Sequence, residues 1–529
     1  MRNKTTLFIL VGLLFFVWVN QSIGQTYNQD IAPLIYSKCS TCHRPGEIGP
    51  MSFTNYEEVK NHSNTIKYVT GTRYMPPWQP DPSYKHFLGE NFLLDEEIKM
   101  IADWVDAGSP EGTEEATPFP DFPDGSVLGE PDLVLSFAES FVHKGNNRDE
   151  YRYFVLPTGL IEDKVLKAIE LRPGNSQIVH HALFFEDLSG QAAENDAKTQ
   201  RYGFDGFGGF AGDDLESILT QKQYPGYVPG QKPIFYPEGL GQTLGAGSDL
   251  VIQMHYAPWP TDETDSTTVN IFFADDSEEI ERSVDSHIMV PLPSVVNDLF
   301  IIYENTVKQF HGVWTVPEDI SMLGISPHMH LLGQDWKVYL KTPSGDSINL
   351  IKVPEWDFNW QGGYFFERLI VAEQGSEVHA IATYDNTAEN PNNPSNPPRT
   401  VSWGENTTDE MYYLPIAYVP YQEGDEEVIF ADSTTPTEDL PAESNTIELI
   451  SPNPSSGLVN VRFNVKYGEA LNITLTDING AKVKTIRAQE FYNNGNHIVH
   501  FNSDVLPSGV YLLSIMGKNQ SITKKFIKQ

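Results

Sequence analysis

The sequence predicts a multidomain, mainly β protein with a small all-α domain near its N-terminus. Its 529 residues exceed the length of one ordinary domain. Short β-type runs, separated by clusters of Gly, Pro, Asn and Asp, recur through residues 131–422, which favours two β-sandwiches. Helix-type patterns occur in residues 25–112, and a further small β unit occupies residues 447–529. We therefore expect one helical domain followed by three β-sandwiches.

Residues 1–24 have the composition of a secretory signal peptide. Basic Arg2 and Lys4 precede an apolar run at residues 7–19, and small residues follow that run at positions 22 and 24. The run is short for a membrane span, and no later stretch reaches spanning length. We expect an exported protein that is soluble or attached by non-helical means.

The chain is strongly acidic. It carries 35 basic and 72 acidic residues, for a formal net charge of −37. A surface with this charge repels nucleic acid and anionic membranes, so we expect neither as a partner. The charge bears on solubility and partners rather than on the fold.

The only two cysteines, Cys39 and Cys42, are followed directly by His43. The spacing Cys-x-x-Cys-His is typical of c-type haem attachment, in which both thiols bond the porphyrin and the histidine binds the iron. Zinc would need more ligands nearby, and a redox dithiol does not need the histidine. We therefore predict one covalently bound haem c at these three residues.

Two helices are predicted around this motif. Residues 27–37 predict a first helix that runs into it. Residues 95–108 predict an amphipathic helix, with Asp95 as its N-cap and Gly108 at its end. A helix on each side of the motif is the context that a haem domain needs.

Met75 lies between these helices on a loop that two prolines stiffen. A thioether opposite His43 would complete the iron coordination and raise its potential, whereas the alternative is ordinary core packing. Residues 25–112 as a whole resemble the small cytochrome c domains. The resemblance implies that His43 and Met75 are the two axial ligands.

Two segments have the composition of linkers. Residues 113–130 are rich in Pro, Glu and Gly, and residues 423–446 are acidic and rich in Thr, Pro and Glu. Between them we place an N-terminal sandwich at residues 131–295 and a C-terminal sandwich at residues 296–422. This region is long enough for both.

Two histidines, His328 and His330, follow an apolar stretch that predicts a buried strand at residues 321–325. Residues i and i+2 of an extended strand point to the same face, so both imidazoles can bind one ion. Taken singly, such residues are more often structural. Other candidate ligands lie in unusual local sequences of their own, namely His180, His181, His255 and Met411.

Taken in chain order, these six residues resemble the ligands of the copper type II, ascorbate-dependent monooxygenases. This family includes peptidylglycine α-hydroxylating and dopamine β-monooxygenase, whose two jelly-roll-like β-sandwich domains each hold one copper across a solvent-filled cleft. The resemblance implies an electron-transfer copper and a catalytic copper, at which dioxygen is activated. Their ligands would be His180, His181 and His255 for the first site, and His328, His330 and Met411 for the second.

The residue types suit copper. Imidazole serves both oxidation states, whereas a thioether favours Cu(I) and is a poor ligand for zinc. Adjacent His180 and His181 would point to opposite faces of a regular strand, so a twist or a bulge is needed there. The chain lacks the disulfides of the animal enzymes, and Tyr412 stands where their pattern has a cysteine. No substrate-binding residue can therefore be carried over.

Two further segments are similar to the same family. They are Trp-Asp-Phe-Asn-Trp-Gln at residues 356–361 and Tyr-Asp-Asn-Thr at residues 384–387. We expect both to pack near the second copper and to shape the loops around it. The sequence assigns no individual role to their residues.

The resemblance implies a secreted monooxygenase that uses dioxygen to hydroxylate a C–H bond of an unidentified organic substrate. Its fused haem domain suggests that electrons enter through haem c from an external donor, either an ascorbate-like reductant or a redox protein. Three alternatives remain open: a non-catalytic haem and copper electron carrier, a copper-binding surface protein, and a zinc hydrolase. Met411 and the absence of a His-Glu-x-x-His motif disfavour the last.

Residues 447–529 predict a separate small β unit. It opens with Ile-Ser-Pro-Asn-Pro at residues 450–454 and continues to Pro-Ser-Gly-Val-Tyr-Leu-Leu at residues 507–513, before a basic end. This unit resembles the C-terminal sorting domain of type IX secretion substrates. The resemblance implies passage through the periplasm of a Gram-negative type envelope to the cell surface or the medium, on the type IX machinery. The alternative is a generic sandwich module for adhesion or carbohydrate binding.

Overall fold

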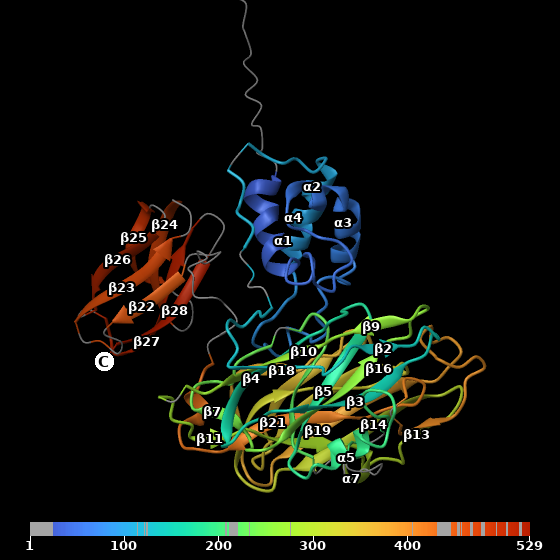
Figure 1. Cartoon of the computed structure of the whole chain (residues 1–529). Helices are drawn as coiled ribbons and strands as arrows, with labels where there is room; N and C mark the ends of the chain where they lie inside the picture. The colour runs from blue at the N-terminus through green and yellow to red at the C-terminus, as the bar shows by residue number, and fades with distance from the viewer. Residues whose placement is uncertain are drawn as a thin grey trace, which may run out of the picture. The chain divides into compact units, whose positions relative to one another are not determined.

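A computed structural model gives the fold of the chain, which divides into two compact units, Met1–Thr434 and Thr435–Gln529 (Figure 1). The predicted signal peptide and residues 431–445 of the predicted acidic linker lie outside the described residues. The structure describes residues 25–528 except 114, 121, 123–124, 207–208, 211–220, 232, 276, 405, 431–445, 452–454, 456, 466–468, 478–481, 493–494, 504–505 and 518–520.

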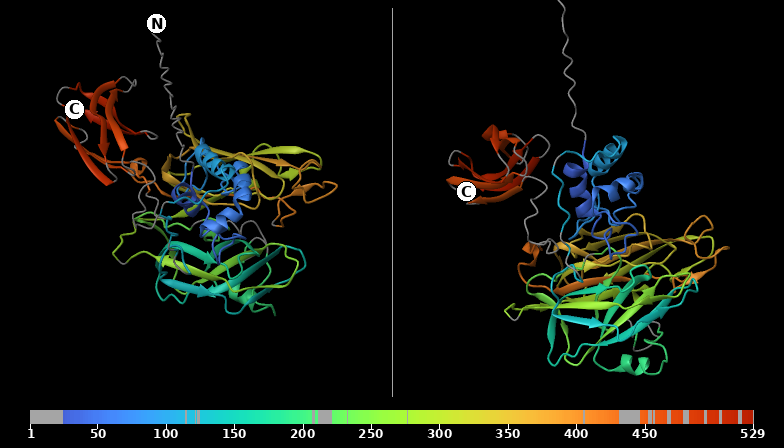
Figure 2. Two further views of the ribbon diagram at one scale, coloured as in Figure 1. Left: turned by 90° about the horizontal axis from the view of Figure 1, so that it is seen from above. Right: turned by 45° about the horizontal axis from the view of Figure 1, so that its top comes forward.

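A bundle of short helices follows residue 25 and appears in blue in Figure 2. Ile35, Val59 and Trp104 are buried in its apolar core. The elements are the π-helix η1 (Tyr27–Ile31), α1 (Ala32–Lys38), α2 (Tyr56–Asn61), α3 (Ser63–Gly71) and α4 (Asp95–Asp106).

Helix α4 differs from its prediction at the N-cap. The cap residue is Leu94 rather than Asp95, because the Glu97 carboxylate accepts the Leu94 N–H at 2.7 Å and so caps the helix from its own first turn. At the other end α4 stops at Asp106, and Gly108 follows with a φ of +89°. A glycine in this left-handed conformation is the common way to end a helix.

The first sandwich combines a five-stranded sheet of order β1-β10-β4-β7-β11 with a four-stranded sheet of order β3-β8-β5-β6. Its core takes side chains from both sheets, including Leu166 of β4 and Ile252 of β8. The elements are β1 (Leu133–Ser136), β2 (Phe141–His143), β3 (Glu150–Pro157), β4 (Lys164–Arg172), β5 (Val179–Asp187), α5 (Gln191–Asp196), β6 (Gln223–Tyr227), β7 (Leu240–Leu244), β8 (Asp249–Tyr256), β9 (Glu263–Asp265), β10 (Thr268–Phe273) and β11 (Arg282–Ser283).

The second sandwich combines two four-stranded sheets, β12-β21-β15-β18 and β14-β19-β16-β17. Trp336 and Phe366, from opposite sheets, lie in its core. The elements are β12 (Asp285–Met289), α7 (Pro291–Ser294), β13 (Ile301–Ile302), β14 (Val307–Thr315), β15 (Ile320–Ile325), β16 (Gly333–Lys341), β17 (Ser347–Val353), β18 (Tyr364–Ala372), β19 (Glu377–Asp385), β20 (Val401–Ser402), β21 (Leu414–Pro420) and the 3-10 helix η2 (Asp425–Glu427).

The chain passes from one sandwich to the other before β12, earlier than the predicted boundary at residues 295 and 296. Strand β12 pairs antiparallel with β21, with Asp285 opposite Tyr418. Residues 285–289 therefore belong to the second sandwich. The sequence of β12 alone cannot predict this boundary, because its partner strand β21 lies far along the chain.

The two sandwiches share apolar contacts. Leu323, Leu369 and Val419 come from strands of the second sandwich, yet they lie in the same buried cluster as the core of the first. The Tyr413 hydroxyl also donates to Gln223 Oε1 at 3.0 Å. The two sandwiches therefore pack directly against each other.

An early segment of the chain also joins the second sandwich. Asp81 N–H donates to the Lys352 carbonyl, and Leu88 N–H donates to the Phe365 carbonyl, both at 2.8 Å. Phe87, only 2% exposed, lies in the core of that sandwich. The segment after α3 thus anchors the helical bundle to β17 and β18.

His287 on β12 provides a test of the second sandwich. Its ring stacks on Trp314 at 3.9 Å, and burial lowers the pKa of His287 to about 4. The unfolded chain therefore binds a proton between pH 6.5 and about 4 that the folded chain does not, so acid destabilises the fold. Between pH 7 and pH 4 the unfolding free energy of the His287→Phe protein should therefore fall by roughly 2 to 3 kcal/mol less than that of the unsubstituted protein. Urea unfolding of the metal-free protein at pH 7 and pH 4 measures the difference. Equal losses in both proteins would contradict it.

The C-terminal unit has a three-stranded sheet of order β22-β23-β26 and a four-stranded sheet of order β25-β24-β27-β28. Val461 and Leu513 lie in its core. The strands are β22 (Thr446–Ser451), β23 (Leu458–Val465), β24 (Glu469–Asp477), β25 (Lys482–Tyr492), β26 (Gly495–Asn502), β27 (Gly509–Met516) and β28 (Ser521–Lys528).

Strands dominate both units, which confirms a multidomain, mainly β fold. None of the helices in the described part of the chain has the length and apolar composition needed to cross a membrane.

Candidate metal centre and haem motif

Strands β5 and β8 bring three of the predicted ligands together. His181 and His255 are opposite each other in the antiparallel pairing, and the register shifts between Val179 and His181. This irregularity is the bulge that adjacent His180 and His181 need in order to reach one point. His181 Nδ1 lies 3.1 Å from His180 Nδ1 and 3.3 Å from His255 Nδ1. The three ring nitrogens lie within 4.8 Å of one another, so they could hold one metal ion.

The three imidazoles are held neutral. Burial lowers the pKa of His180, and it lowers the pKa values of His181 and His255 well below the usual range, with further lowering from neighbouring histidines. His255 Nε2–H donates to Asp149 Oδ1 at 2.7 Å, and the Tyr151 ring stacks on His255 at 4.2 Å. A neutral histidine that donates from Nε2 keeps a lone pair on Nδ1, as a metal ligand requires.

His328 and His330 follow β15 on an extended segment. His328 N–H donates to the Tyr413 carbonyl at 2.9 Å, and Tyr413 N–H returns a bond to the His328 carbonyl at 3.2 Å. In this antiparallel pair Met411, two residues before Tyr413, comes opposite His330. The rings of His328 and His330 lie 5.2 Å apart. The backbone thus places the three predicted ligands of the second site on two facing segments.

Burial also keeps these two histidines neutral. It lowers the pKa of His328 to about 3 and that of His330 to about 4. His330 Nδ1–H donates to the Asp409 carbonyl at 3.2 Å, which leaves the lone pair on Nε2. A backbone carbonyl in this position fixes the orientation of a ligand ring.

Glu410 joins the two segments. Its carboxylate is 0% exposed and accepts the backbone N–H groups of His330 at 3.0 Å, Leu332 at 2.7 Å and Met411 at 3.2 Å. Burial raises the pKa of Glu410 to about 8, against the opposing effect of these three donors. One side chain therefore positions the backbone of both His330 and Met411.

Replacing Glu410 by Ala should destabilise the second sandwich strongly. Three buried N–H groups would lose their acceptor, and each unsatisfied buried group costs about 1–3 kcal/mol, so we expect a loss of about 3 kcal/mol or more. Urea unfolding followed by tryptophan fluorescence measures it. Glu410→Gln keeps one oxygen acceptor and should lose less. A loss below about 1 kcal/mol for the alanine variant would show that water replaces the carboxylate.

The two histidine sets adjoin, unlike the cleft that the family resemblance implies. The rings of His181 and His328 lie 6.1 Å apart. Phe358 stacks on His180 at 5.1 Å and meets His330 edge-on at 5.8 Å. The apolar contacts between the two sandwiches bring the two histidine sets together.

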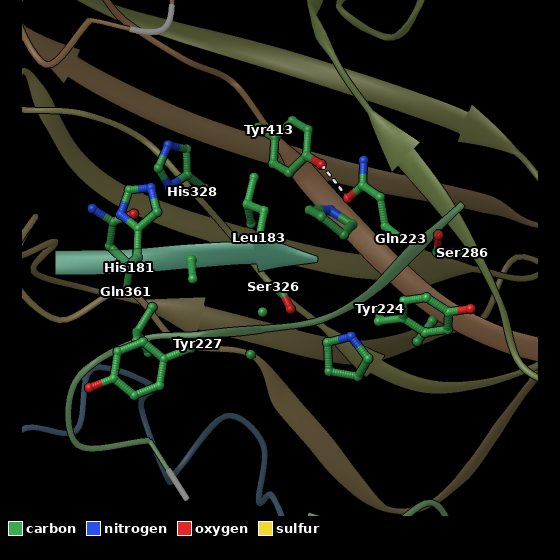
Figure 3. A pocket seen from close by; sticks show the side chains of 18 of the residues that line it. His181, Leu183, Gln223, Tyr224, Tyr227, Ser286, Ser326, His328, Gln361 and Tyr413 are labelled. Carbon is green, nitrogen blue, oxygen red and sulfur yellow. Dashed lines mark hydrogen bonds between the residues drawn. The ribbon is translucent and has the colours of Figure 1, made fainter. Parts of the chain in front are cut away.

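A pocket that is partly open to solvent extends from the histidines between the two sandwiches. His181 and His328 lie near one end in Figure 3, and Tyr224 and Ser286 lie near the other. Met411 also lines it. Most of its other lining side chains are aromatic, apolar or neutral and polar, so it suits an uncharged organic molecule.

The haem motif lies at the end of α1. Cys39 and Cys42 are not joined by a disulfide. His43 Nδ1 bonds the Met51 carbonyl at 3.1 Å, and its ring stacks on Phe53 at 4.7 Å. Only glycine fits at position 49, because a Cβ there would lie 2.7 Å from His43 Nδ1. The ring is therefore fixed with Nε2 left for a ligand.

Met75 is half-buried after α3, and its N–H donates to the Val69 carbonyl at 3.1 Å. Within the described residues the side chains packed in the helical core include Cys39 and Met51 but not Met75. Met75 as the second axial ligand therefore stays a prediction.

The haem motif faces the first sandwich. Arg172 Nη2 donates to Glu47 Oε1 at 3.0 Å, and a second pocket is lined by Cys42, Glu47, Arg172 and Tyr227 among others. A Cβ at Gly230 would lie 3.7 Å from Cys42 Sγ and 4.0 Å from Trp360 Cζ3. The segment after β6 therefore separates the haem motif from the histidine pocket. Tyr227 and Gln231 of this segment line both pockets.

Sequence reasoning did not assign roles to Asp149, Glu410 or Phe358. Glu410 lies directly before Met411, and Phe358 lies in a segment that was singled out without a role for its residues. Nothing in the sequence around Asp149 indicates its role, because it meets His255 only when β3 pairs with β8.

Residues 449–529 match the family described as the Secretion system C-terminal sorting domain. This confirms the sorting domain predicted for the C-terminal unit. The protein is therefore exported to the cell surface or secreted, and it interacts with the type IX secretion machinery. A comparison with curated proteins finds no match.

Solved structures similar to parts of the chain include two beta-glucuronidases and a viral capsid protein. The Faecalibacterium prausnitzii beta-glucuronidase is 13% identical over 45% of this chain and 40% of its own, with a TM-score of 0.14. Bacteroides uniformis beta-glucuronidase 3 is 13% identical over 45% of this chain and 29% of its own, with a TM-score of 0.13. The infectious bursal disease virus VP2 subviral particle is 9% identical over 59% of this chain and 77% of its own, with a TM-score of 0.16. The chain spans less than half the length of either beta-glucuronidase, and such TM-scores carry no argument.

Proposed function

We propose that the protein is an exported copper-dependent monooxygenase that hydroxylates a C–H bond of an uncharged organic substrate with dioxygen. The observation that carries the proposal is the convergence of the His180, His181 and His255 ring nitrogens beside the segment of His328 and His330, at the end of a large pocket. Met411 lines the same pocket.

The donor set of the first site fits copper. Three neutral imidazoles suit both Cu(I) and Cu(II), and the Asp149 carboxylate behind His255 is the partner that metal-ligating histidines usually have. The second set adds a thioether, which favours Cu(I) over zinc. Copper bound at both sites would supply two electrons for the reduction of dioxygen.

The second set leaves room for substrate. Three ligands leave a coordination position open, as catalytic metals require. The pocket would hold the substrate beside this position, and its apolar and aromatic walls would contact the substrate around the reacting C–H bond. Gln223 and Tyr413, which are hydrogen-bonded to each other on its wall, would orient a polar group of the substrate.

The helical bundle fits a covalently bound haem c. The Met51 carbonyl orients His43, and the two thiols are not joined by a disulfide. A thiol pair followed by a histidine is the donor set that attaches haem c. The haem would receive single electrons from an external donor.

The first experiment measures the metal content and the visible spectrum of protein matured with haem and loaded with copper. About one haem and two coppers per chain, with the reduced protein reoxidised by air, is the expected result. Haem with one copper or none, or two coppers that air does not reoxidise, would favour a non-catalytic electron carrier or copper-binding protein instead.

A further inference from the structure

Phe358 contacts both histidine sets. Its ring lies 5.1 Å from the His180 ring at an interplanar angle of 22°, and 5.8 Å from the His330 ring at 89°. A stacked ring and an edge-on ring both give direct van der Waals contact of aromatic systems. Within the segment 356–361, Phe358 is therefore a residue that contacts the candidate metal centre.

Trp360, two residues later, faces the haem motif. Trp360 Cζ3 and Cys42 Sγ lie on the same glycine, Gly230, at 4.0 Å and 3.7 Å from the position of its Cβ. The indole edge and the thiol therefore both border the side of Gly230 on which a Cβ would lie.

The segment 356–361 is held in place from both sides. Gln79 Nε2, from the segment between α3 and α4, donates to the Asp357 carbonyl at 2.6 Å. Gln361 Nε2 closes the turn by donating to the Phe358 carbonyl at 2.7 Å, and Trp356, 8% exposed, packs in the core of the second sandwich. The positions of Phe358 and Trp360 are thus fixed relative to both sites.

We propose that Trp360 and Phe358 form the connector through which an electron passes from haem at Cys42 and His43 to copper at His180, His181 and His255. This rests on the proposed function. In the step, the ferrous haem iron loses one electron and becomes ferric, and Cu(II) gains it and becomes Cu(I). The two aromatic side chains, two residues apart on one segment, would remain neutral, and the external donor would then reduce the haem again. Phe358 also touches His330, so the same ring reaches the second site.

The test follows electron transfer without dioxygen or substrate. Protein holding one haem and two Cu(II) receives one electron per chain from a photochemical reductant under argon. The loss of the ferrous haem absorption band and the loss of the Cu(II) resonance signal then report the same event. Trp360→Leu and Phe358→Leu should each abolish the fast phase of haem oxidation, while the haem spectrum and the copper count stay as in the unsubstituted protein.

Two further variants serve as controls. Asn359 is exposed and lies between the two aromatic residues, where its side chain bonds Asp357, so Asn359→Ala should keep the fast phase. Tyr227→Leu tests the rival route, because Tyr227 lines both pockets and pairs with Ala182 next to His181. A fast phase that survives in both leucine variants of the connector but disappears in Tyr227→Leu would overturn the proposal.

Failure of the proposed function gives a different result. The unsubstituted protein could bind no copper, or could bind copper that does not oxidise the haem. In either case the proposed function is wrong, and so is the proposed connector. If electron transfer occurs and the substitutions at 358 and 360 do not slow it, only the connector is wrong.

Discussion

Replacing Met411 by Ile should abolish reoxidation of the reduced protein by dioxygen. The substitution removes the soft sulfur that would stabilise Cu(I) at the second site, while it keeps an apolar side chain of similar size where Met411 packs near Ile288 and Tyr413. Copper at His180, His181 and His255 and the haem spectrum should be unchanged. Oxygen consumption with a chemical reductant, together with copper analysis, measures both.

The matched control is Met322→Ile, which makes the same exchange in the core of the second sandwich away from the histidines. Its effect should be limited to stability, by less than about 1.5 kcal/mol. Normal oxygen consumption by the Met411→Ile protein would remove Met411 from the second site. It would also reopen the alternative of a site without a thioether.

His181→Ala should lower the copper content from about two per chain to one. His181 Nδ1 is the atom within 3.3 Å of both other ring nitrogens of the first site, so its loss leaves that site with two ligands instead of three. We expect oxidation of the haem to slow when one electron is supplied, because only the copper of the second site remains as an acceptor. Copper analysis and the visible spectrum check the two effects separately.

His86→Ala is the control for this variant. His86 is an exposed histidine that bonds Glu90, and its removal should change neither copper nor haem. Two coppers retained by His181→Ala would mean that the first site draws its ligands from other residues, such as His328 across the 6.1 Å that separates the two rings.

The grouping of His180, His181 and His255 was expected from the family resemblance, and each of them lies in an apolar run that predicts a strand. The pairing that brings them together could not be anticipated, since His181 and His255 meet through a register that shifts beside His181. The sequence indicated that a bulge or a twist was needed, and the structure supplies the bulge. Local pattern identifies a strand, but register depends on the partner strand.

The supporting residues were harder to anticipate. Glu410 is an ordinary acidic residue in the sequence and becomes significant only when β15 and the segment before β21 place three N–H groups around it. Phe358 and Trp360 contact residues that lie far away along the chain. Contacts of this kind have no periodicity and no motif, so they follow from tertiary packing alone.

The anchoring of Phe87 in the second sandwich has a consequence for the order of folding. The helical bundle forms from contacts within one short stretch of chain, whereas Phe87 must wait for Tyr364 and Phe366, which are synthesised and exported much later. The bundle therefore folds first, and the sandwiches close over it afterwards. Under the proposed function, haem would be attached to Cys39 and Cys42 in the interval between these events, before Gly230 and Trp360 pack beside Cys42.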